Sequence, residues 1–204
     1  MKKLTLVFVV LLFFVGAFAQ QRSFNLSQFS FEDTLGKKYN LDSLKGKVVF
    51  VDCWFPSCPP CRAEMPFSKT LQERLKASKM DSNIVFVTIC FKQTTAEWKK
   101  ALHELPMPNA IHLYSPASTY EIVLAGGNYP TYRIFNTVGV LDIYDAPRPS
   151  EKNKIDFILF AATQNIGIKE ASILFETEVA KGLANNQFSP KSQIVIDFLK
   201  KTIN

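Results

Sequence analysis

The fold of this 204-residue chain is decided by the stretch Val48-Val49-Phe50-Val51-Asp52-Cys53-Trp54-Phe55-Pro56-Ser57-Cys58-Pro59-Pro60-Cys61-Arg62. The strongly apolar run from Val48 to Trp54 predicts a buried strand, and the residues after it predict a helix. Cys58 then stands at the helix N-cap and Cys61 one turn inside. Cβ atoms three residues apart on a helix lie roughly 5–6 Å apart. A disulfide needs about 3.5–4.5 Å, so a small adjustment lets this pair close and reopen.

The first nineteen residues predict where the chain works. Met1-Lys2-Lys3 is a short basic start, Leu4 to Val15 is almost wholly apolar, and Ala17-Phe18-Ala19 has the small-x-small pattern of a cleavage site. We therefore expect a signal peptide over residues 1–19, cleaved after Ala19. The apolar run is shorter than the roughly 20 residues that a bilayer span needs. Membrane anchoring is expected only if the signal stays uncleaved. The expected location is periplasmic or secreted, where disulfides persist.

The remaining chain has the size of one domain with a well-formed core. The formal charge of the whole sequence is +6, and its basic residues are scattered among acidic ones. Because no basic stripe is interleaved with aromatic residues, nucleic-acid binding is not expected.

The order of apolar runs, turn residues and prolines predicts an α/β fold with a mixed sheet. We expect one β-hairpin over residues 24–41 and a second between strands at residues 131–135 and 140–144. The other expected elements are a helical turn at residues 42–46, strands at 48–54, 84–91 and 110–114, and helices at 58–79, 94–105 and 118–125. Pro66 lies inside the first of these helices and predicts a kink.

The tail over residues 150–204 has a helical pattern. We expect its first apolar stripe to cover the sheet and two later stripes to pack beside it. The first stripe consists of Ile155, Ile158, Leu159 and Ala162. A docking surface for a partner or a second subunit is the alternative for the later helices.

Four separate motifs make the chain similar to one family. Val51-Asp52-Cys53-Trp54 resembles the end of that family's central strand, and the string CPPCRAEMP from Cys58 to Pro66 resembles its active site. Tyr129-Pro130-Thr131 resembles its cis-proline loop, and Ala146 to Ser150 resembles the exit from its last strand. The chain therefore resembles the TlpA/ResA-like branch of secreted thioredoxin-fold proteins, which are grouped with redoxins.

The resemblance implies a thioredoxin-like fold, in which helices flank a central mixed β-sheet that begins with an N-terminal β-hairpin. It implies a thioredoxin-like domain over residues 24–163. Residues 164–204 are then a C-terminal helical extension, longer than the family's usual final helix, packed on or beside that domain. Cys53 is a second departure, because it stands where the family usually has a large apolar residue.

The resemblance implies a protein thiol–disulfide oxidoreductase with a redox-active Cys58–Cys61 disulfide. Cys58 would be the nucleophile, because open N–H groups and the positive end of the helix dipole favour a thiolate at the N-cap. Cys61 would be the resolving thiol. Pro59 and Pro60 have no N–H, which leaves the Cys61 N–H as the main backbone donor to the thiolate. Weaker stabilisation of the dithiol makes a better reductant, so reduction is the preferred direction.

The family also carries a buried acid beneath this site. Asp52 would accept the Cys61 proton, because burial raises the pKa of a carboxyl toward neutral pH. A partly solvated structural aspartate is the alternative. Glu64 is the rival base, and we expect it to be exposed.

A substrate surface around the thiol is a further implication of the resemblance. Pro130 is expected to be cis and to hold the Tyr129 backbone beside Cys58, where a substrate strand can pair with it. The residues expected to bind substrate are Trp54, Phe55, Pro59, Pro60, Tyr129 and Thr131. For Trp54, simple core packing is the alternative.

The other two cysteines, Cys53 and Cys90, are expected to be buried free thiols that point to opposite faces of the sheet. A second disulfide between them is the alternative. No cofactor is expected. A metal-binding or delivery module built on the Cys58–Cys61 pair is one alternative function. A closed zinc site needs four ligands, however, and His103 and His112 are at unsuitable spacing. A thiol-dependent peroxidase of the peroxiredoxin type is the other alternative.

The expected partners follow from the predicted location and the resemblance. They are disulfide-containing envelope proteins, with cytochrome c apoproteins as frequent clients of relatives, and a membrane thiol protein that donates electrons. A reductase in an oxidising compartment requires such a donor.

Overall fold

The structure, a computed structural model, describes residues 23–115, 118–142, 145–185 and 189–202. The predicted signal peptide over residues 1–19 lies outside the described residues. Within the described part of the chain, no helix is both long enough and apolar enough to cross a membrane.

Six strands form one mixed sheet in the described chain, in the order β2-β1-β5-β4-β3-β6. They are β1 (Ser30–Glu32), β2 (Lys38–Asn40), β3 (Val48–Trp54), β4 (Ile84–Cys90), β5 (Ala110–Tyr114) and β6 (Thr131–Phe135). Strands β3, β4 and β5 are parallel, β6 is antiparallel to β3, and β1 joins β5 from the predicted N-terminal hairpin. Every residue of β3 is buried, and this strand lies inside the sheet, between β4 and β6.

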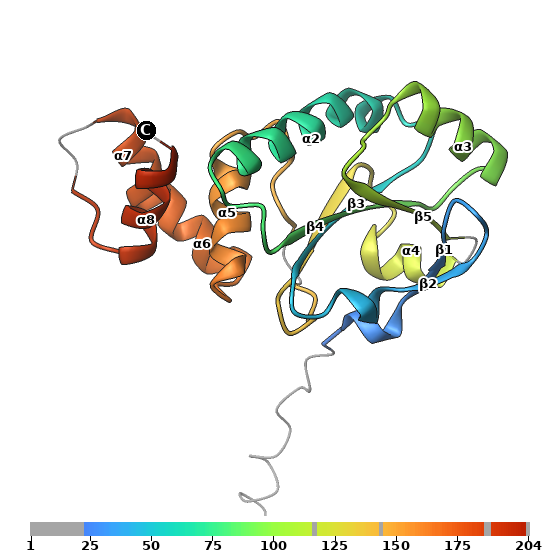
Figure 1. The fold of residues 1–204 in the computed structure, drawn as a ribbon, viewed down its shortest axis with the longest axis horizontal. Helices are drawn as coiled ribbons and strands as arrows, with labels where there is room; N and C mark the ends of the chain where they lie inside the picture. Colours follow the sequence, from blue (N-terminus) through green and yellow to red (C-terminus); the bar gives the residue numbers. More distant parts are fainter. Residues whose placement is uncertain (1–22, 116–117, 143–144, 186–188, 203–204) are drawn as a thin grey trace, which may run out of the picture.

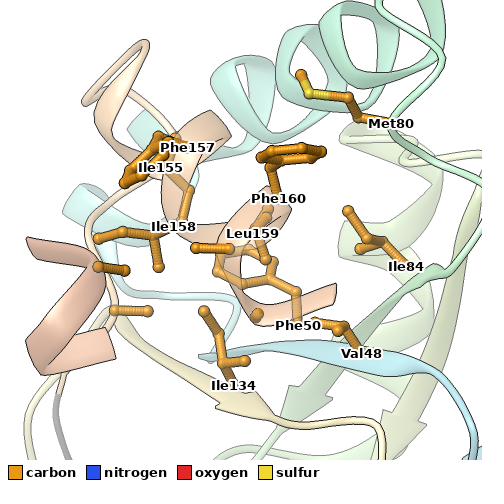
Figure 2. Packing of buried hydrophobic residues seen from close by; sticks show 14 of the residues in the cluster. Val48, Phe50, Met80, Ile84, Ile134, Ile155, Phe157, Ile158, Leu159 and Phe160 are labelled. Carbon is orange, nitrogen blue, oxygen red and sulfur yellow. The ribbon is translucent and has the colours of Figure 1, made fainter. Parts of the chain in front are cut away.

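Helices cover both faces of the sheet (Figure 1). They include α2 (Pro59–Ala77), α3 (Thr95–Glu104), α4 (Ser118–Leu124) and α5 (Lys154–Thr163). On one face, Val48 and Phe50 share a hydrophobic cluster with Leu71 and Leu75 of α2. Figure 2 shows the apolar side chains of α5 above Val48, Phe50 and Ile134 in this cluster. On the other face, alternate β3 residues pack with α4 and the N-terminal hairpin, as the two-residue period of a strand requires.

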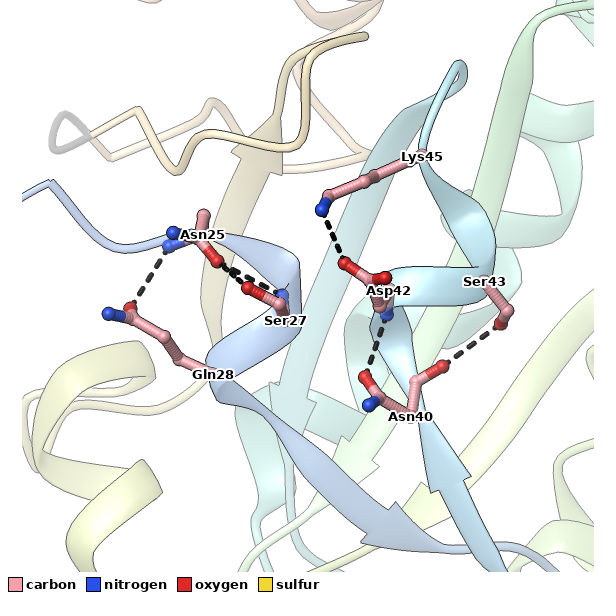
Figure 3. A network of polar contacts seen from close by, with 7 residues as sticks. All are labelled: Asn25, Ser27, Gln28, Asn40, Asp42, Ser43 and Lys45. Carbon is pink, nitrogen blue, oxygen red and sulfur yellow. Dashed lines mark hydrogen bonds and ion pairs between the residues drawn. The ribbon is translucent and has the colours of Figure 1, made fainter.

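Two short 3-10 helices, η1 (Leu26–Gln28) and η2 (Leu41–Leu44), flank the hairpin. Asn25 caps η1, since its Oδ1 accepts the Ser27 N–H at 3.1 Å (Figure 3). Asn40 caps η2 in the same way, with its Oδ1 2.9 Å from the Asp42 nitrogen. The second of these helices is the predicted turn at residues 42–46, whereas η1 was not predicted because three residues give no helical period.

The C-terminal helices lie at one end of the molecule and pack on α5 (Figure 1). They are α6 (Ile168–Leu174), the π-helix η3 (Phe175–Val179), α7 (Ala180–Ala184) and α8 (Gln193–Thr202). Phe198 of α8 meets Phe157 of α5 edge-on, with ring centroids 5.1 Å apart. A Cβ at Gly182 would lie 2.8 Å from a methyl carbon of Leu199, so glycine permits this close approach. The first apolar stripe covers the sheet, and the later ones pack beside it, as predicted.

The second predicted hairpin is only partly formed. Val140 and Leu141 make isolated bridges to Asn25 and Phe135 instead of a strand, and residues 143–144 lie outside the described residues. The Leu141 N–H donates to the Phe24 carbonyl at 2.7 Å. The hairpin with β6 is nevertheless made, because the Asn136 N–H donates to the Val140 carbonyl at 3.0 Å and the Asp142 N–H to the Ile134 carbonyl at 2.9 Å. The continuous strand expected from residue 140 is therefore reduced to single bridges in the described residues.

Candidate active site

The two cysteines of the C-P-P-C stretch form a disulfide at the N-terminus of α2. Cys58 is the N-cap residue, as predicted, and its sulfur accepts the Cys61 N–H at 3.2 Å. Pro59 and Pro60 begin the helix, where proline's fixed φ suits the first turn and its missing N–H costs nothing. Both prolines are exposed. The local sequence thus places a buried disulfide next to two exposed prolines, with one backbone donor on the Cys58 sulfur.

A compact apolar cluster supports the disulfide. Cys58 and Cys61 are 3% and 2% exposed, and they pack with side chains from β3, β4, α2 and α3. The buried members of this cluster besides the disulfide are Trp54, Met65, Cys90, Trp98 and Ala101. We expected Trp54 to contribute to the surface around the thiol. That expectation is wrong, because Trp54 is 0% exposed and packs beneath the site.

Asp52 lies two residues before the end of β3, on the sheet face that α2 covers. Its side chain is buried, and its Oδ1 has no hydrogen-bond partner among the described residues. Burial, and secondly the nearby Glu64 charge, raise the pKa of the Asp52 carboxyl to about 8. A carboxyl with this pKa can exchange a proton near neutral pH. The predicted burial and raised pKa are confirmed, whereas the role of Asp52 stays a prediction.

Glu64 differs from its expected position. It is buried on α2, and both of its carboxylate oxygens are used. Oε1 accepts the Ser150 hydroxyl at 2.7 Å, and Oε2 accepts the Ser150 N–H at 3.1 Å. The expectation that Glu64 is exposed is therefore wrong. Because these bonds hold Glu64 in the interior, its charge acts on Asp52 and Tyr132.

The loop before β6 brings a proline next to these residues. The Tyr129–Pro130 peptide bond is cis, as predicted. Tyr129 is half-buried and packs edge-on against Phe55, with ring centroids 4.9 Å apart. Thr131 was expected to bind substrate, but its side chain is buried and its hydroxyl donates to the Asn128 carbonyl at 2.6 Å. The Thr131 side chain therefore holds the loop and is not free for a ligand.

Cys53 and Cys90 are both buried free thiols, as predicted. They belong to clusters on opposite faces of the sheet. Burial is the main cause that raises the pKa of each thiol, to about 12 for Cys90. Among the described residues, no three His, Cys, Asp or Glu side chains group as metal ligands.

Sequence reasoning did not find three polar side chains beside the disulfide. Lys92, Gln93 and Glu121 contact the residues around it from loops and helices distant in sequence. Each is a common surface residue type with no motif around it, so no sequence signal pointed to it.

A mixed sheet, a disulfide at the start of the helix after its central strand, and an adjacent cis-proline loop define a thioredoxin-like protein. The chain belongs to the Redoxin family, whose model matches residues 22–136. It is similar to the thiol-disulfide oxidoreductase ResA of Bacillus subtilis, with 32% identity over 68 residues, which are 33% of this chain and 38% of ResA. These features agree with the predicted TlpA/ResA-like branch.

Two further proteins extend the comparison. The thioredoxin-like protein YneN of Bacillus subtilis is 29% identical over 116 residues, 55% of this chain and 64% of YneN. The chain thus spans less than two thirds of the length of either curated relative. A thiol:disulfide interchange protein of the thioredoxin family from Chlorobium tepidum shares the fold, with a TM-score of 0.52 and 19% identity over 70% of this chain and 99% of that one.

Proposed function

We propose that this chain is a protein thiol–disulfide oxidoreductase that reduces disulfides of envelope proteins. The observation that carries the proposal is the Cys58–Cys61 disulfide at the N-terminus of α2, beside the cis-Pro130 loop. Membership of the Redoxin family and similarity to proteins named thiol-disulfide oxidoreductases support the same activity.

The proposed cycle begins with the reduced pair. The Cys58 thiolate attacks one sulfur of a client disulfide, forms a mixed disulfide and expels the other client sulfur as a thiolate. Cys61 then gives its proton to the Asp52 carboxylate and attacks the Cys58 sulfur. The Cys58–Cys61 disulfide forms and the second client thiolate leaves. The client has gained two electrons, and a donor dithiol must return two electrons to the chain before the next cycle.

The residues around the disulfide support reduction over oxidation. The Cys58 sulfur accepts one backbone N–H, that of Cys61, because the two intervening prolines have none. A thiolate with few donors is stabilised weakly, and a weakly stabilised dithiol form makes a reducing pair.

The remaining parts of the proposal concern place and partners. The signal-peptide pattern over residues 1–19 supports a periplasmic or secreted location. An oxidising compartment supplies client disulfides, with cytochrome c apoproteins among the candidates, and it requires a membrane thiol protein as electron donor. Phe55, Pro59, Pro60 and Tyr129 lie exposed or half-buried near the disulfide and are the residues that we propose contact the client.

The test is the reduction potential of the Cys58–Cys61 pair, measured by equilibration with dithiothreitol or glutathione buffers. A value near or below about −270 mV, that of thioredoxin, supports a reductase, and a value near about −120 mV, that of DsbA, would make the protein an oxidant instead. Insulin-disulfide reduction should be lost in Cys58→Ser. Peroxide consumption or a stoichiometric bound metal would favour the alternative functions.

A further inference from the structure

The loop after β4, Phe91–Gln93, reaches the side of the active site where the rings of Phe55 and Tyr129 pack together. The Lys92 ammonium lies 5.3 Å from the ring centroid of Phe55 and 4.8 Å from that of Tyr129. Both distances are within the range of a cation–π interaction. Lys92 therefore joins the segment after β3 to the loop that carries the cis proline.

A carboxylate completes this contact. Glu121 of α4 accepts the Tyr129 hydroxyl at 2.7 Å and lies 3.3 Å from the Lys92 nitrogen through the same oxygen, Oε1. The Glu121 side chain is 19% exposed and that of Lys92 is 44% exposed, so the pair lies at the surface but is partly shielded from solvent. The Lys92 ammonium and the Glu121 carboxylate thus hold the Tyr129 side chain in one position.

The next residue in the loop contacts the other side of the site. The Ser57 N–H, one residue before Cys58, donates to the Gln93 side-chain oxygen at 2.8 Å. Gln93 has a φ of 74°, in the left-handed region that residues other than glycine seldom occupy. Such conformations persist where surrounding contacts impose them, often at functional sites.

The loop is itself anchored from beneath. The Cys90 thiol donates to the Lys92 carbonyl at 3.2 Å, and the Tyr114 hydroxyl donates to the Gln93 carbonyl at 2.8 Å. Because its backbone is held on the sheet side, the loop can act as a rigid support for both side chains.

We propose that Lys92 and Gln93 are positioning residues for client binding, and that they fix the separation between the Ser57–Cys58 turn and the Tyr129 loop. An extended, disulfide-containing polypeptide segment then meets two loops that are already held in place, and less free energy is lost on ordering these loops at each encounter. This inference rests on the proposed function. Neither side chain is placed at the reacting sulfurs, so their effect is on binding of a polypeptide and not on sulfur exchange.

The experiment measures steady-state reduction of two disulfide substrates, a disulfide-linked peptide and bis(2-hydroxyethyl) disulfide, which has no peptide backbone to contact the two loops. In Lys92→Met, methionine keeps much of the apolar stem and removes the charge. We expect the KM for the peptide to rise about five- to tenfold, from the loss of the cation–π and ion-pair contacts. The ratio of kcat/KM between peptide and small disulfide should fall by the same factor, with kcat for the peptide and the reduction potential unmoved.

Two variants and one control separate this effect from a general loss of structure. Lys92→Arg should restore the ratio, because a guanidinium can pair with Glu121 and stack on both rings. Gln93→Gly removes the side chain that accepts the Ser57 N–H, while glycine adopts the left-handed backbone without strain, and this variant should also raise the peptide KM. Lys99→Met, an exposed lysine on α3, is the matched control and should behave as the unmodified protein.

Three results would overturn the inference while leaving the proposed function intact. They are an unchanged peptide KM in both Lys92→Met and Gln93→Gly, an equal fall in kcat/KM for the two substrates, and no recovery in Lys92→Arg. If the unmodified protein reduces neither substrate, the proposed function fails and the inference fails with it.

Discussion

Replacing Asp52 by asparagine should stabilise the oxidised protein, and the gain should grow with pH. Burial, and secondly the Glu64 charge, raise the pKa of the folded-state carboxyl from 3.8 to about 8. Between these two values, the unfolded chain gives up the Asp52 proton while the folded protein keeps it. The free energy of unfolding contributed by this group is therefore greatest below pH 3.8 and is lost as the pH rises through about 8. Asparagine does not ionise, so the variant avoids this loss.

The size of the effect follows from the same pKa values. At about 1.4 kcal/mol per pH unit, a rise from 3.8 to about 8 amounts to about 6 kcal/mol. This is an upper limit, because relaxation of the protein and entry of water reduce the free-energy cost of a buried charge. We expect Asp52→Asn to gain about half of this limit in unfolding free energy, which is about 3 kcal/mol above pH 8. At pH 5 the expected gain is about 1 kcal/mol or less.

The assay is urea unfolding of the oxidised protein at pH 5, 7 and 9, followed by circular dichroism. The quantity compared is the difference in unfolding free energy between Asp52→Asn and the unmodified chain. Glu73→Gln, at an exposed position on the same helix as Glu64, is the control and should change stability by less than about 0.5 kcal/mol. A gain that is equal at pH 5 and pH 9, or a loss at pH 9, would refute a buried carboxyl with a raised pKa.

Three further predictions concern packing and reactivity. Asp156→Asn should lower the unfolding free energy by about 2–3 kcal/mol, because the Arg74 guanidinium donates to both Asp156 oxygens at 2.9 and 2.8 Å; a loss below about 1 kcal/mol in urea unfolding would contradict it. Thr94→Ala removes the N-cap of α3 and should cost about 1 kcal/mol, seen as a lower melting temperature, and an unchanged Tm would argue against the cap. In the reduced native protein, a thiol reagent should leave Cys53 and Cys90 unmodified, because both are buried and burial raises their pKa; rapid reaction of either would contradict this.

The predictions that succeeded rest on short-range signals. The bounds of β3 and the N-cap position of Cys58 agree with the structure. An apolar run followed by a proline at the first helical position specifies both within a dozen residues. The helix expected from residue 94 likewise begins at a local signal, because Thr94 caps α3 and the structure completes a capping box with Glu97.

The predictions that failed concern side chains whose partners are distant in sequence. A glutamate on a helix is usually exposed, but Glu64 is buried because Ser150, 86 residues later, offers it two donors. Likewise, an aromatic residue at the end of a strand can lie at the surface or in the core. Trp54 is core because Trp98 of α3 closes over the same cluster. Neither partner has a local pattern that could identify it.

The topology explains why the site nonetheless forms where the motifs suggested. Parallel strands β3 and β4 end at the same edge of the sheet, and β6 begins there because Thr131 pairs with Cys53. The loops that hold Cys58, Lys92 and Tyr129 must therefore meet at that edge, as loops do at the carboxyl ends of strands in open α/β sheets. The strand order thus decides which loops converge. Which side chains touch depends on distances of a few ångströms, such as the 2.7 Å between Glu121 and the Tyr129 hydroxyl, and these arise only when the whole chain has packed.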